Sequence, residues 1–422
     1  MKVEKNNMLP QGWSKIPVRD IAQIIRGVSY GKGDASETPK EGYLPILRAT
    51  NIQNNKLFFD CDLVYVPPRV VSEKQKLKVG DIVVATSSGS KHLVGKTAQL
   101  KTEWTGSFGV FCAVIRPFAT LEPRYLGYFF DSPVYKSYIS KKAIGVNINN
   151  LRRGDIEEIL IPVAPLHDQK LIVSEIEKQF SRLDEAVAAL KRVRASLKRY
   201  KAAVLKAAVE GKLVTSEQKK WKTTTVGEVS EVVTKGSSPN WQGFEYSSEG
   251  VVFVRSQNVS WGHLDLSDVA HLPLAFNKKE KKSVLRTGDV LLNIVGASIG
   301  RAAVATKSIE GGNINQAVAV IRPLRDRLLP QFLMCYFLSE KVQKLIHAQK
   351  VDVARANYSL DQIRKLPLHL PPLDDQHRIV EEIESRLSVA EEIEQTININ
   401  LKRAERLRQA ILKKAFSGRL VS

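Results

Sequence analysis

The sequence predicts an α/β (α+β) protein made of two mixed blocks, each followed by a long helix, with the two helices paired as an antiparallel coiled coil. The first observation behind this fold class is a repeat. Residues 165–169, Pro-Leu-His-Asp-Gln, return as residues 372–376, Pro-Leu-Asp-Asp-Gln, at an offset of 207 residues. The residues after each copy have helical periodicity, whereas those before it form short β-branched runs separated by Gly, Pro and Asn. A period this long indicates duplication of a domain, because solenoid units are only about 20 to 50 residues long.

The helical segments are expected at residues 165–215 and 372–422. Apolar residues in both recur at alternating steps of three and four, which is the spacing of a coiled-coil seam. Each segment follows a proline, begins with an acidic cap candidate and ends near a glycine, as helices do. About 40 residues at a rise of 1.5 Å would form a rod about 60 Å long. If a pseudo-twofold axis relates the halves, the two seams bury each other in antiparallel orientation. The alternative is that each helix packs only on its own block.

The mixed blocks are expected at residues 1–164 and 216–371, and they also repeat, although more loosely. Residues 44–51, Leu-Pro-Ile-Leu-Arg-Ala-Thr-Asn, align with residues 251–258, Val-Val-Phe-Val-Arg-Ser-Gln-Asn. The apolar strand cores are kept while the loops between them differ. This pattern is typical of two versions of one binding module that have acquired different targets.

The charge of the chain favours a polyanionic partner. The formal net charge is +20 and the pI is near 9.7, so nucleic acid is the first candidate. An anionic membrane is the second candidate, but the chain has no run of about eighteen apolar residues and no signal-peptide pattern. We therefore expect a cytoplasmic protein. Cys61, Cys112 and Cys335 lie far apart, which predicts neither a disulfide framework nor a metal site, and no bound cofactor is expected.

The doubled helix signature resembles one family. The segment 203–206, Ala-Val-Leu-Lys, recurs as 410–413, Ala-Ile-Leu-Lys, and each is followed by Gly-Lys-Leu or Gly-Arg-Leu. Together with the Pro-Leu-x-x-Gln starts and the two variable blocks, these motifs are similar to those of the specificity subunits of type I restriction-modification systems. The resemblance covers essentially the whole chain.

The resemblance implies a function for each segment. Residues 1–164 and 216–371 would be target-recognition domains, each reading one half of a bipartite, asymmetric site on double-stranded DNA. Residues 165–215 and 372–422 would be conserved helical spacers. Two methyltransferase subunits would dock on the helices and bring S-adenosylmethionine for adenine methylation, and restriction subunits with motor and nuclease activity would join the complex.

Motifs for catalysis are missing from the sequence. An amino-methyltransferase needs an (Asn/Asp/Ser)-Pro-Pro-(Tyr/Phe) loop to hold a flipped base, and the Pro-Pro pairs at 67–68 and 371–372 do not fit it. Residues 90–97 resemble a phosphate-binding loop but have Ser90 in place of the first glycine. We therefore expect a non-catalytic DNA-binding subunit. The alternatives are a self-sufficient modification enzyme and a coiled-coil scaffold that binds nucleic acid.

Candidate DNA contacts are polar loop residues that follow strand-like runs. Arg and Lys suit guanine edges, and Asn and Gln suit adenine edges. In the first block the candidates are Arg26, Tyr30, Arg48, Asn51, Ser88, Ser90, Lys91, Lys96, Asn147 and Asn149. In the second they are Lys235, Arg255, Gln257, Asn258, Asn293, Ser298, Asn315 and Gln316. Each could instead be a solvated or turn-forming side chain. Lys91 and Lys96 are read as phosphate contacts, and the equivalence of Arg48 and Arg255 suggests a scaffold or phosphate role.

Overall fold

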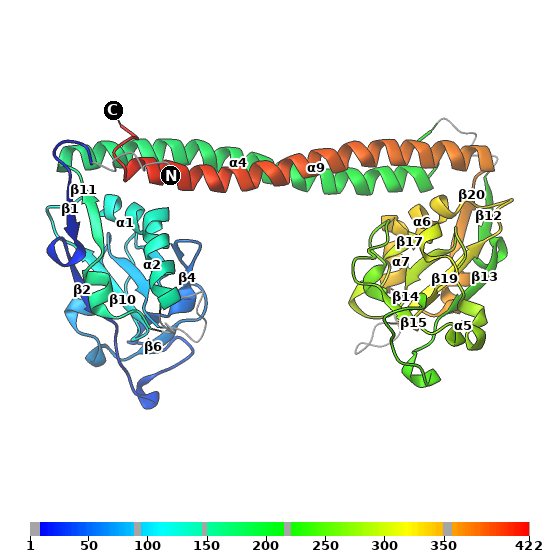
Figure 1. The fold of residues 1–422 in the computed structure, drawn as a ribbon, viewed down its shortest axis with the longest axis horizontal. Coiled ribbons are helices and arrows are strands. Elements are labelled where there is room, and N and C mark those ends of the chain that lie inside the picture. The colour runs from blue at the N-terminus through cyan, green and yellow to red at the C-terminus, as the bar shows by residue number, and fades with distance from the viewer. Residues whose placement is uncertain (1–8, 88–93, 146–149, 215–220, 349–356, 422) are drawn as a thin grey trace. The chain divides into compact units, whose positions relative to one another are not determined.

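The computed structural model describes residues 9–87, 94–145, 150–214, 221–348 and 357–421 (Figure 1). The chain divides into two compact units, residues 1–190 with 399–422 and residues 191–398. Each unit therefore combines one mixed block with part of both long helices. The boundary between the units lies within each long helix, at residues 190/191 and 398/399. The division into four separate domains therefore stays a prediction.

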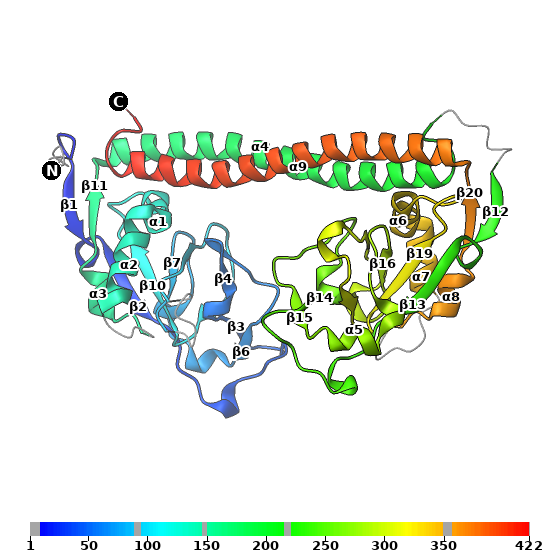
Figure 2. The same ribbon diagram turned by 45° about the vertical axis from the view of Figure 1, so that its right-hand side comes forward.

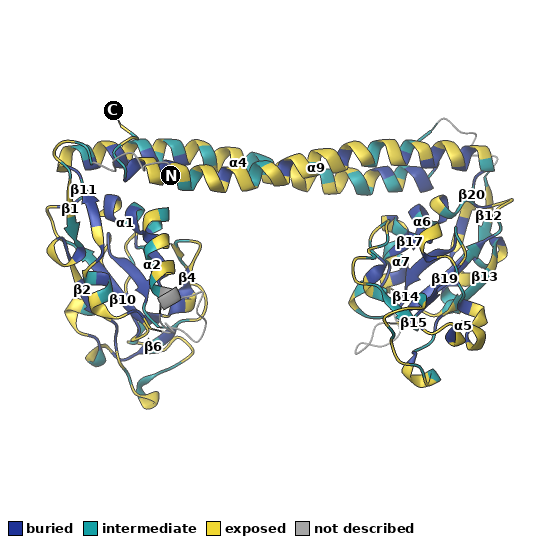
Figure 3. Ribbon diagram, viewed as in Figure 1, coloured by how far each residue is buried: buried dark blue, intermediate teal, exposed yellow. Residues whose placement is uncertain are grey.

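The two expected helices are α4, Leu166–Val209, and α9, Leu373–Ala415. Figures 1 and 2 show them side by side. An ion pair joins Asp184 to Arg408 in the first unit, and another joins Lys201 to Glu394 at 2.8 Å in the second. Residue numbers fall along α9 as they rise along α4, so the pairing is antiparallel, as predicted. Figure 3 shows buried positions near both ends of α4, whereas the middle of this helix is intermediate or exposed.

The positions that face the seam of α9 differ in part from those expected. Ile393 and Leu407 fit the three-four spacing, yet they are 40% and 49% exposed. The neighbouring Glu394 and Arg408 occupy the seam instead, and steps of three and four residues in alternation, beginning with three, lead back to them from the buried Ile411 through Ala404 and Ile397. Their charges are tolerated there because each has an opposite charge on α4, and the Lys201 ammonium lowers the pKa of Glu394. The seam is therefore partly ionic.

Each mixed block is built on a four-stranded antiparallel sheet with the same strand order. In the first unit the order is β2-β10-β7-β8, with strands Ala22–Arg26, Cys112–Pro117, Ile82–Ala85 and Thr97–Gln99. In the second it is β13-β19-β16-β17, with strands Ser230–Lys235, Val318–Pro323, Val290–Asn293 and Ala302–Val304. The internal repeat is thus confirmed strand by strand. The apolar runs of β10 and β19 are buried because core residues pack on both faces of these central strands.

Smaller sheets and short helices complete each block, and most of them, though not β4-β5 and α5, occur in matching pairs. A two-stranded ribbon opens and closes each block, β1-β11 (Ser14–Pro17, Leu160–Val163) and β12-β20 (Lys222–Thr225, Pro367–Leu370). Three-stranded sheets are β6-β3-β9 (Val64–Val66, Leu44–Leu47, Ser107–Phe108) and β15-β14-β18 (Ala270–Leu272, Val251–Val254, Asn313–Ile314). The pair β4-β5 is Ile52–Gln53 with Lys56–Leu57. The helices are α1 Pro123–Asp131, α2 Pro133–Gly145, α3 Arg153–Glu157, α5 Ala275–Lys279, α6 Pro330–Leu338, α7 Glu340–Ala348 and α8 Leu360–Arg364.

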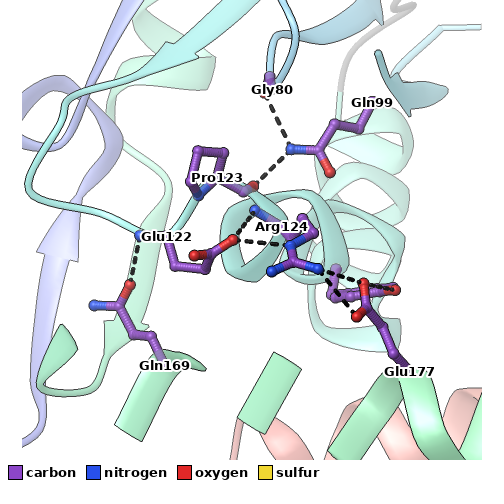
Figure 4. Close-up of polar contacts among 8 residues, drawn as sticks. Gly80, Gln99, Glu122, Pro123, Arg124, Gln169 and Glu177 are labelled. Atoms are coloured by element: carbon purple, nitrogen blue, oxygen red, sulfur yellow. Dashed lines mark hydrogen bonds and ion pairs between the residues drawn. The ribbon is translucent and has the colours of Figure 1, made fainter. Parts of the chain in front are cut away.

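The glutamine of the Pro-Leu-x-x-Gln motif fastens each long helix to its block. Gln169 is buried; its Nε2 donates to the Ala164 carbonyl at 2.8 Å, and its Oε1 accepts the Glu122 N–H at 3.0 Å (Figure 4). Gln376 makes equivalent bonds, accepting one backbone N–H at 2.8 Å and donating to two carbonyls at 2.8 and 2.9 Å. In the first unit, Arg124 adds an ion pair with Glu177 of α4 at 3.1 Å. The motif therefore sets where the block meets the helix.

Two general findings concern the part of the chain that the structure describes. None of its helices combines the length and the apolar character needed to cross a membrane. Within the same residues, no three His, Cys, Asp or Glu side chains gather as they would around a metal ion.

Candidate nucleic-acid interface

Three chain segments meet at one end of the first block's main sheet. Strand β2 ends at Arg26, which pairs with Ala113, and strand β7 ends at Ala85, which pairs with Cys112. The turn 109–112 leads into β10 at the same end. Backbone bonds hold the segments together, since the N–H of Gly27 donates to the Cys112 carbonyl at 3.1 Å. The loops after β2 and β7 and the turn before β10 therefore present their side chains together.

The structure gathers three of the predicted first-block residues around this turn. Arg26 is exposed at the end of β2, and Arg48 follows β3, whose Leu47 carbonyl accepts the Gly109 N–H at 2.8 Å. Tyr30, in the loop after β2, is partly buried near Arg48. Burial raises the pKa of Tyr30, and the nearby Arg48 guanidinium opposes that rise. Arg48 is half-exposed, and the Asp62 carboxylate that it faces is 3.9 Å away, which is longer than a hydrogen bond. The Arg48 guanidinium can therefore still bind a phosphate or a base edge.

The second block repeats this arrangement around the turn 315–318. The Gly236 N–H donates to the Val318 carbonyl at 3.4 Å, and the Asn315 N–H donates to the carbonyl that ends β14 at 3.1 Å. Of the predicted residues, Lys235, Asn315 and Gln316 lie at this sheet end. Asn315 Oδ1 accepts the Ala317 N–H at 3.2 Å, so this amide also braces the turn. Ser298 lies in the 3₁₀ turn Gly296–Ser298 that follows β16.

A glycine directly follows each edge strand, Gly27 after β2 and Gly236 after β13. Close packing against the turn before the central strand explains both glycines. A Cβ on Gly27 would lie 2.0 Å from the Gly109 carbonyl oxygen, and a Cβ on Gly236 would lie 1.9 Å from that of Ile314. No side chain fits there unless the backbone moves. We expect Gly27→Ala to destabilise the first unit by about 1–3 kcal/mol, the usual cost of overpacking. Gly33→Ala is the matched control, since nothing lies within 4 Å of that Cβ. Equal urea unfolding midpoints for the two variants would contradict the packing argument.

Two predicted contacts are wrong because their side chains are buried and satisfied. Asn51 Oδ1 accepts the Arg48 N–H at 2.7 Å, and its Nδ2 donates to the Phe58 and Cys61 carbonyls at 2.9 and 2.7 Å. Asn258 makes the three equivalent bonds, each at 2.9 Å. Both amides are shielded from solvent. They shape the loop after β3 or β14 and cannot reach a base.

Three further second-block candidates are held by local contacts. Asn293 is fully buried and donates to the Ser256 carbonyl at 2.8 Å, so the prediction that it contacts DNA is also wrong. Arg255 donates to the Asp268 carbonyl at 2.8 Å, and Gln257 Nε2 donates to the Asp268 carboxylate at 2.8 Å. Arg255 is thus engaged within its own block, unlike the half-exposed Arg48.

The remaining first-block candidates divide into two groups. Lys96 is exposed immediately before β8 and stays a predicted phosphate contact. The others lie outside the described residues: Ser88, Ser90, Lys91, Asn147 and Asn149.

Exposed aromatic and apolar residues are the functional candidates that sequence reasoning missed. Val110 and Phe111, in the first turn, are 52% and 62% exposed, and Trp241 is 82% exposed. Trp241 belongs to the 3₁₀ turn Asn240–Gln242, whose Gln242 carbonyl accepts a bond from Lys279 at 3.0 Å. Other exposed lysines near Lys279 in the sequence are Lys278, Lys281 and Lys282. Aromatic side chains beside lysines are suited to nucleic acid, but the sequence pattern does not show which aromatic residues are exposed.

One protein-family model matches both copies of the internal repeat. The family model described as "Type I restriction modification DNA specificity domain" matches the chain twice, at residues 10–198 and 218–403. The chain belongs to this family. The two matches of the specificity-domain family correspond to the two copies of block and helix.

Relatives in this specificity-domain family align along nearly the whole chain. The Type I restriction enzyme EcoKI specificity subunit of Escherichia coli (strain K12) is 33% identical over 426 residues, covering 98% of this chain and 90% of that protein. The StySPI specificity subunit of Salmonella potsdam is 33% identical over 424 residues, with the same coverage of 98% and 90%.

Solved structures support the fold of this family. A chain presented under "Structural basis underlying complex assembly and conformational transition of the type I R-M system" superposes with a TM-score of 0.74 at 21% identity, covering 98% of this chain and 100% of that chain. The HsdS subunit from Thermoanaerobacter tengcongensis superposes with a TM-score of 0.58 at 20% identity, covering 100% of both chains.

Proposed function

We propose that this chain is the DNA-specificity subunit of a type I restriction-modification complex. Each mixed block acts as a target-recognition domain and reads one half of a bipartite, asymmetric site on double-stranded DNA. One observation carries this proposal. The two sheet ends share a backbone scheme and a crowded glycine but carry different side chains, Arg26 and Phe111 in the first and Lys235 and Gln316 in the second. Equal scaffolds with unequal surfaces suit a target whose halves differ.

The charge of the chain supports duplex DNA as the ligand. The net charge of +20 lies partly in exposed side chains at the sheet ends, such as Arg26, Arg48 and Lys235. Such residues hold the protein on phosphates, while base edges provide the sequence preference. Binding should therefore weaken steeply with salt, although the preference for the specific site should persist.

Methyl transfer is assigned to partner subunits. The chain lacks the Pro-Pro loop that holds a flipped adenine, so a base extracted from the helix has no pocket of that kind here. We propose that two methyltransferase subunits bind along α4 and α9 and supply S-adenosylmethionine chemistry, and that restriction subunits join this core. The specificity subunit itself would then carry no cofactor.

The test is a reconstitution with radiolabelled S-adenosylmethionine. We expect adenine methylation of genomic DNA only when the full chain and its partner methyltransferase are mixed, and none with either protein alone. Methyl transfer by the purified chain by itself would favour a self-sufficient modification enzyme. Methylation by the partner alone, with the same sites modified, would remove the specificity role from this chain.

A further inference from the structure

The turn 109–112 is held rigidly by its backbone. The Cys112 N–H donates to the Gly109 carbonyl at 2.8 Å, which closes the turn. The Phe111 carbonyl accepts the N–H groups of Thr86 and Ser87 at 2.9 and 3.2 Å. The turn is therefore fastened to β10 and to the segment after β7, and its two central side chains project from a fixed base.

Those two side chains are apolar and more than half exposed. Val110 is 52% exposed and Phe111 is 62% exposed, and Arg26 and Arg48 flank the turn. An exposed apolar pair on a rigid base indicates a contact surface rather than a core residue. The arginines on either side indicate that the contacted surface is anionic.

The second block shows that the scaffold does not require an apolar turn. The equivalent turn, residues 315–318, begins beside the same kind of glycine, and its Ala317 carbonyl accepts the Ile294 N–H at 2.9 Å. Gln316 and Ala317 stand where the first block has Val110 and Phe111. Since the backbone bonds are alike, the fold does not require an apolar pair at this turn.

We propose that the turn 109–112 is a specificity-determining wedge, in which Phe111 inserts into a base step of the first half-site while Gln316 reads a base edge in the second. This inference rests on the proposed function and deepens it. Apolar side chains that enter between base pairs unstack them, and pyrimidine–purine steps unstack most readily. The Gln316 amide can instead pair with the edge of an adenine. The first block would thus recognise a base step that unstacks easily, and the second block would recognise a base by hydrogen bonds to its edge.

Exchange of the two turns tests the wedge directly. Val110→Gln with Phe111→Ala gives the first block the second block's turn, and Gln316→Val with Ala317→Phe does the reverse. Full-length variants are assembled with the partner methyltransferase and bound to duplexes that carry the site found by methylation mapping. A 2-aminopurine placed at successive positions reports unstacking, because its fluorescence rises when its neighbours separate. Phe118→Ala is the matched control, since Phe118 is an exposed aromatic after the opposite end of β10.

The methyltransferase extracts its target adenine in each half-site and raises 2-aminopurine fluorescence there. Apart from these two adenines, we expect the wild-type complex to raise the fluorescence at one step of the first half-site and at none of the second. The first exchange should remove that signal and weaken binding about tenfold or more, because the stacking of Phe111 on a base is lost. The reverse exchange should create a signal in the second half-site, which keeps the test decisive if the first variant folds poorly. Phe118→Ala should change neither quantity.

Two results would count against the inference and are distinguishable. Site-specific binding by the wild-type complex without unstacking outside the two target adenines, and with unchanged affinity after the exchange, overturns the wedge and leaves the proposed function standing. Absence of any sequence preference in the wild-type complex overturns the proposed function and the wedge with it.

Discussion

Replacing Arg322 by methionine should destabilise the second unit by about 3–5 kcal/mol, because it leaves a buried carboxylate without its counter-charge. The Asp289 carboxylate is almost fully buried, and Arg322 binds it through two bonds of 2.7 and 2.8 Å. The first block repeats the pair, with Arg116 and Asp81 joined by two bonds of 2.7 Å. The pair is therefore part of the shared scaffold. Urea unfolding of the full chain, followed by circular dichroism, measures the loss.

Two further variants make this prediction specific. Arg286→Met removes a partner from an exposed pair, 3.4 Å from Glu231, and should cost less than about 1 kcal/mol. The double variant Asp289→Leu with Arg322→Met should recover most of the lost stability, because two apolar side chains can replace a buried ion pair. A double variant as unstable as the single one would mean that packing of Arg322, and not its charge, stabilises the block.

Exchanging residues 221–371 for the equivalent block of another family member should change one half-site completely and leave the other half-site and the spacer unchanged. The structure shows where to cut. Strands β12 and β20 pair from Lys222 with Leu370 to Thr225 with Pro367, so both must be transferred together. An exchange that stopped at residue 365 would split this ribbon. Gln376 stays with the helix but binds two backbone groups of the block, and the donor block must therefore have the same loop before α6.

The outcome of the exchange is read by methylation mapping. The original half-site should lose its methylation and a new half-site should appear, at the same separation from the unchanged half. An exchange that altered both half-sites, or the separation alone, would mean that the division of labour between blocks and helices is wrong. Exchange of residues 9–164, bounded by the ribbon β1-β11, is the matched experiment in the first block.

The sequence predicted the architecture well because a duplication displays its own pattern. The offset of 207 residues and the three-four spacing were enough for both helices, their antiparallel pairing and two blocks of like topology. The detail of the seam was harder to predict. Ile393 and Leu407 are apolar and correctly spaced, but Glu394 and Arg408 take their places through ion pairs that only the partner helix reveals.

The candidate site was predicted less well, for a physical reason. Asn and Gln serve turns as readily as bases, and only the fold shows that Asn51, Asn258 and Asn293 are buried with their Nδ2 groups bonded within the block. Exposed apolar residues were missed for the opposite reason. A phenylalanine beside β10 is expected in the core, yet the closed turn 109–112 directs Phe111 outward.

The most direct test of the central claim is long-read methylation mapping of DNA from cells that express this chain with its partner methyltransferase. We predict one bipartite, asymmetric motif with a spacer of constant length and a methylated adenine in each half, and its loss when this chain is removed. A continuous palindromic motif, or methylation that persists without this chain, would contradict the assignment of sequence recognition to its two blocks.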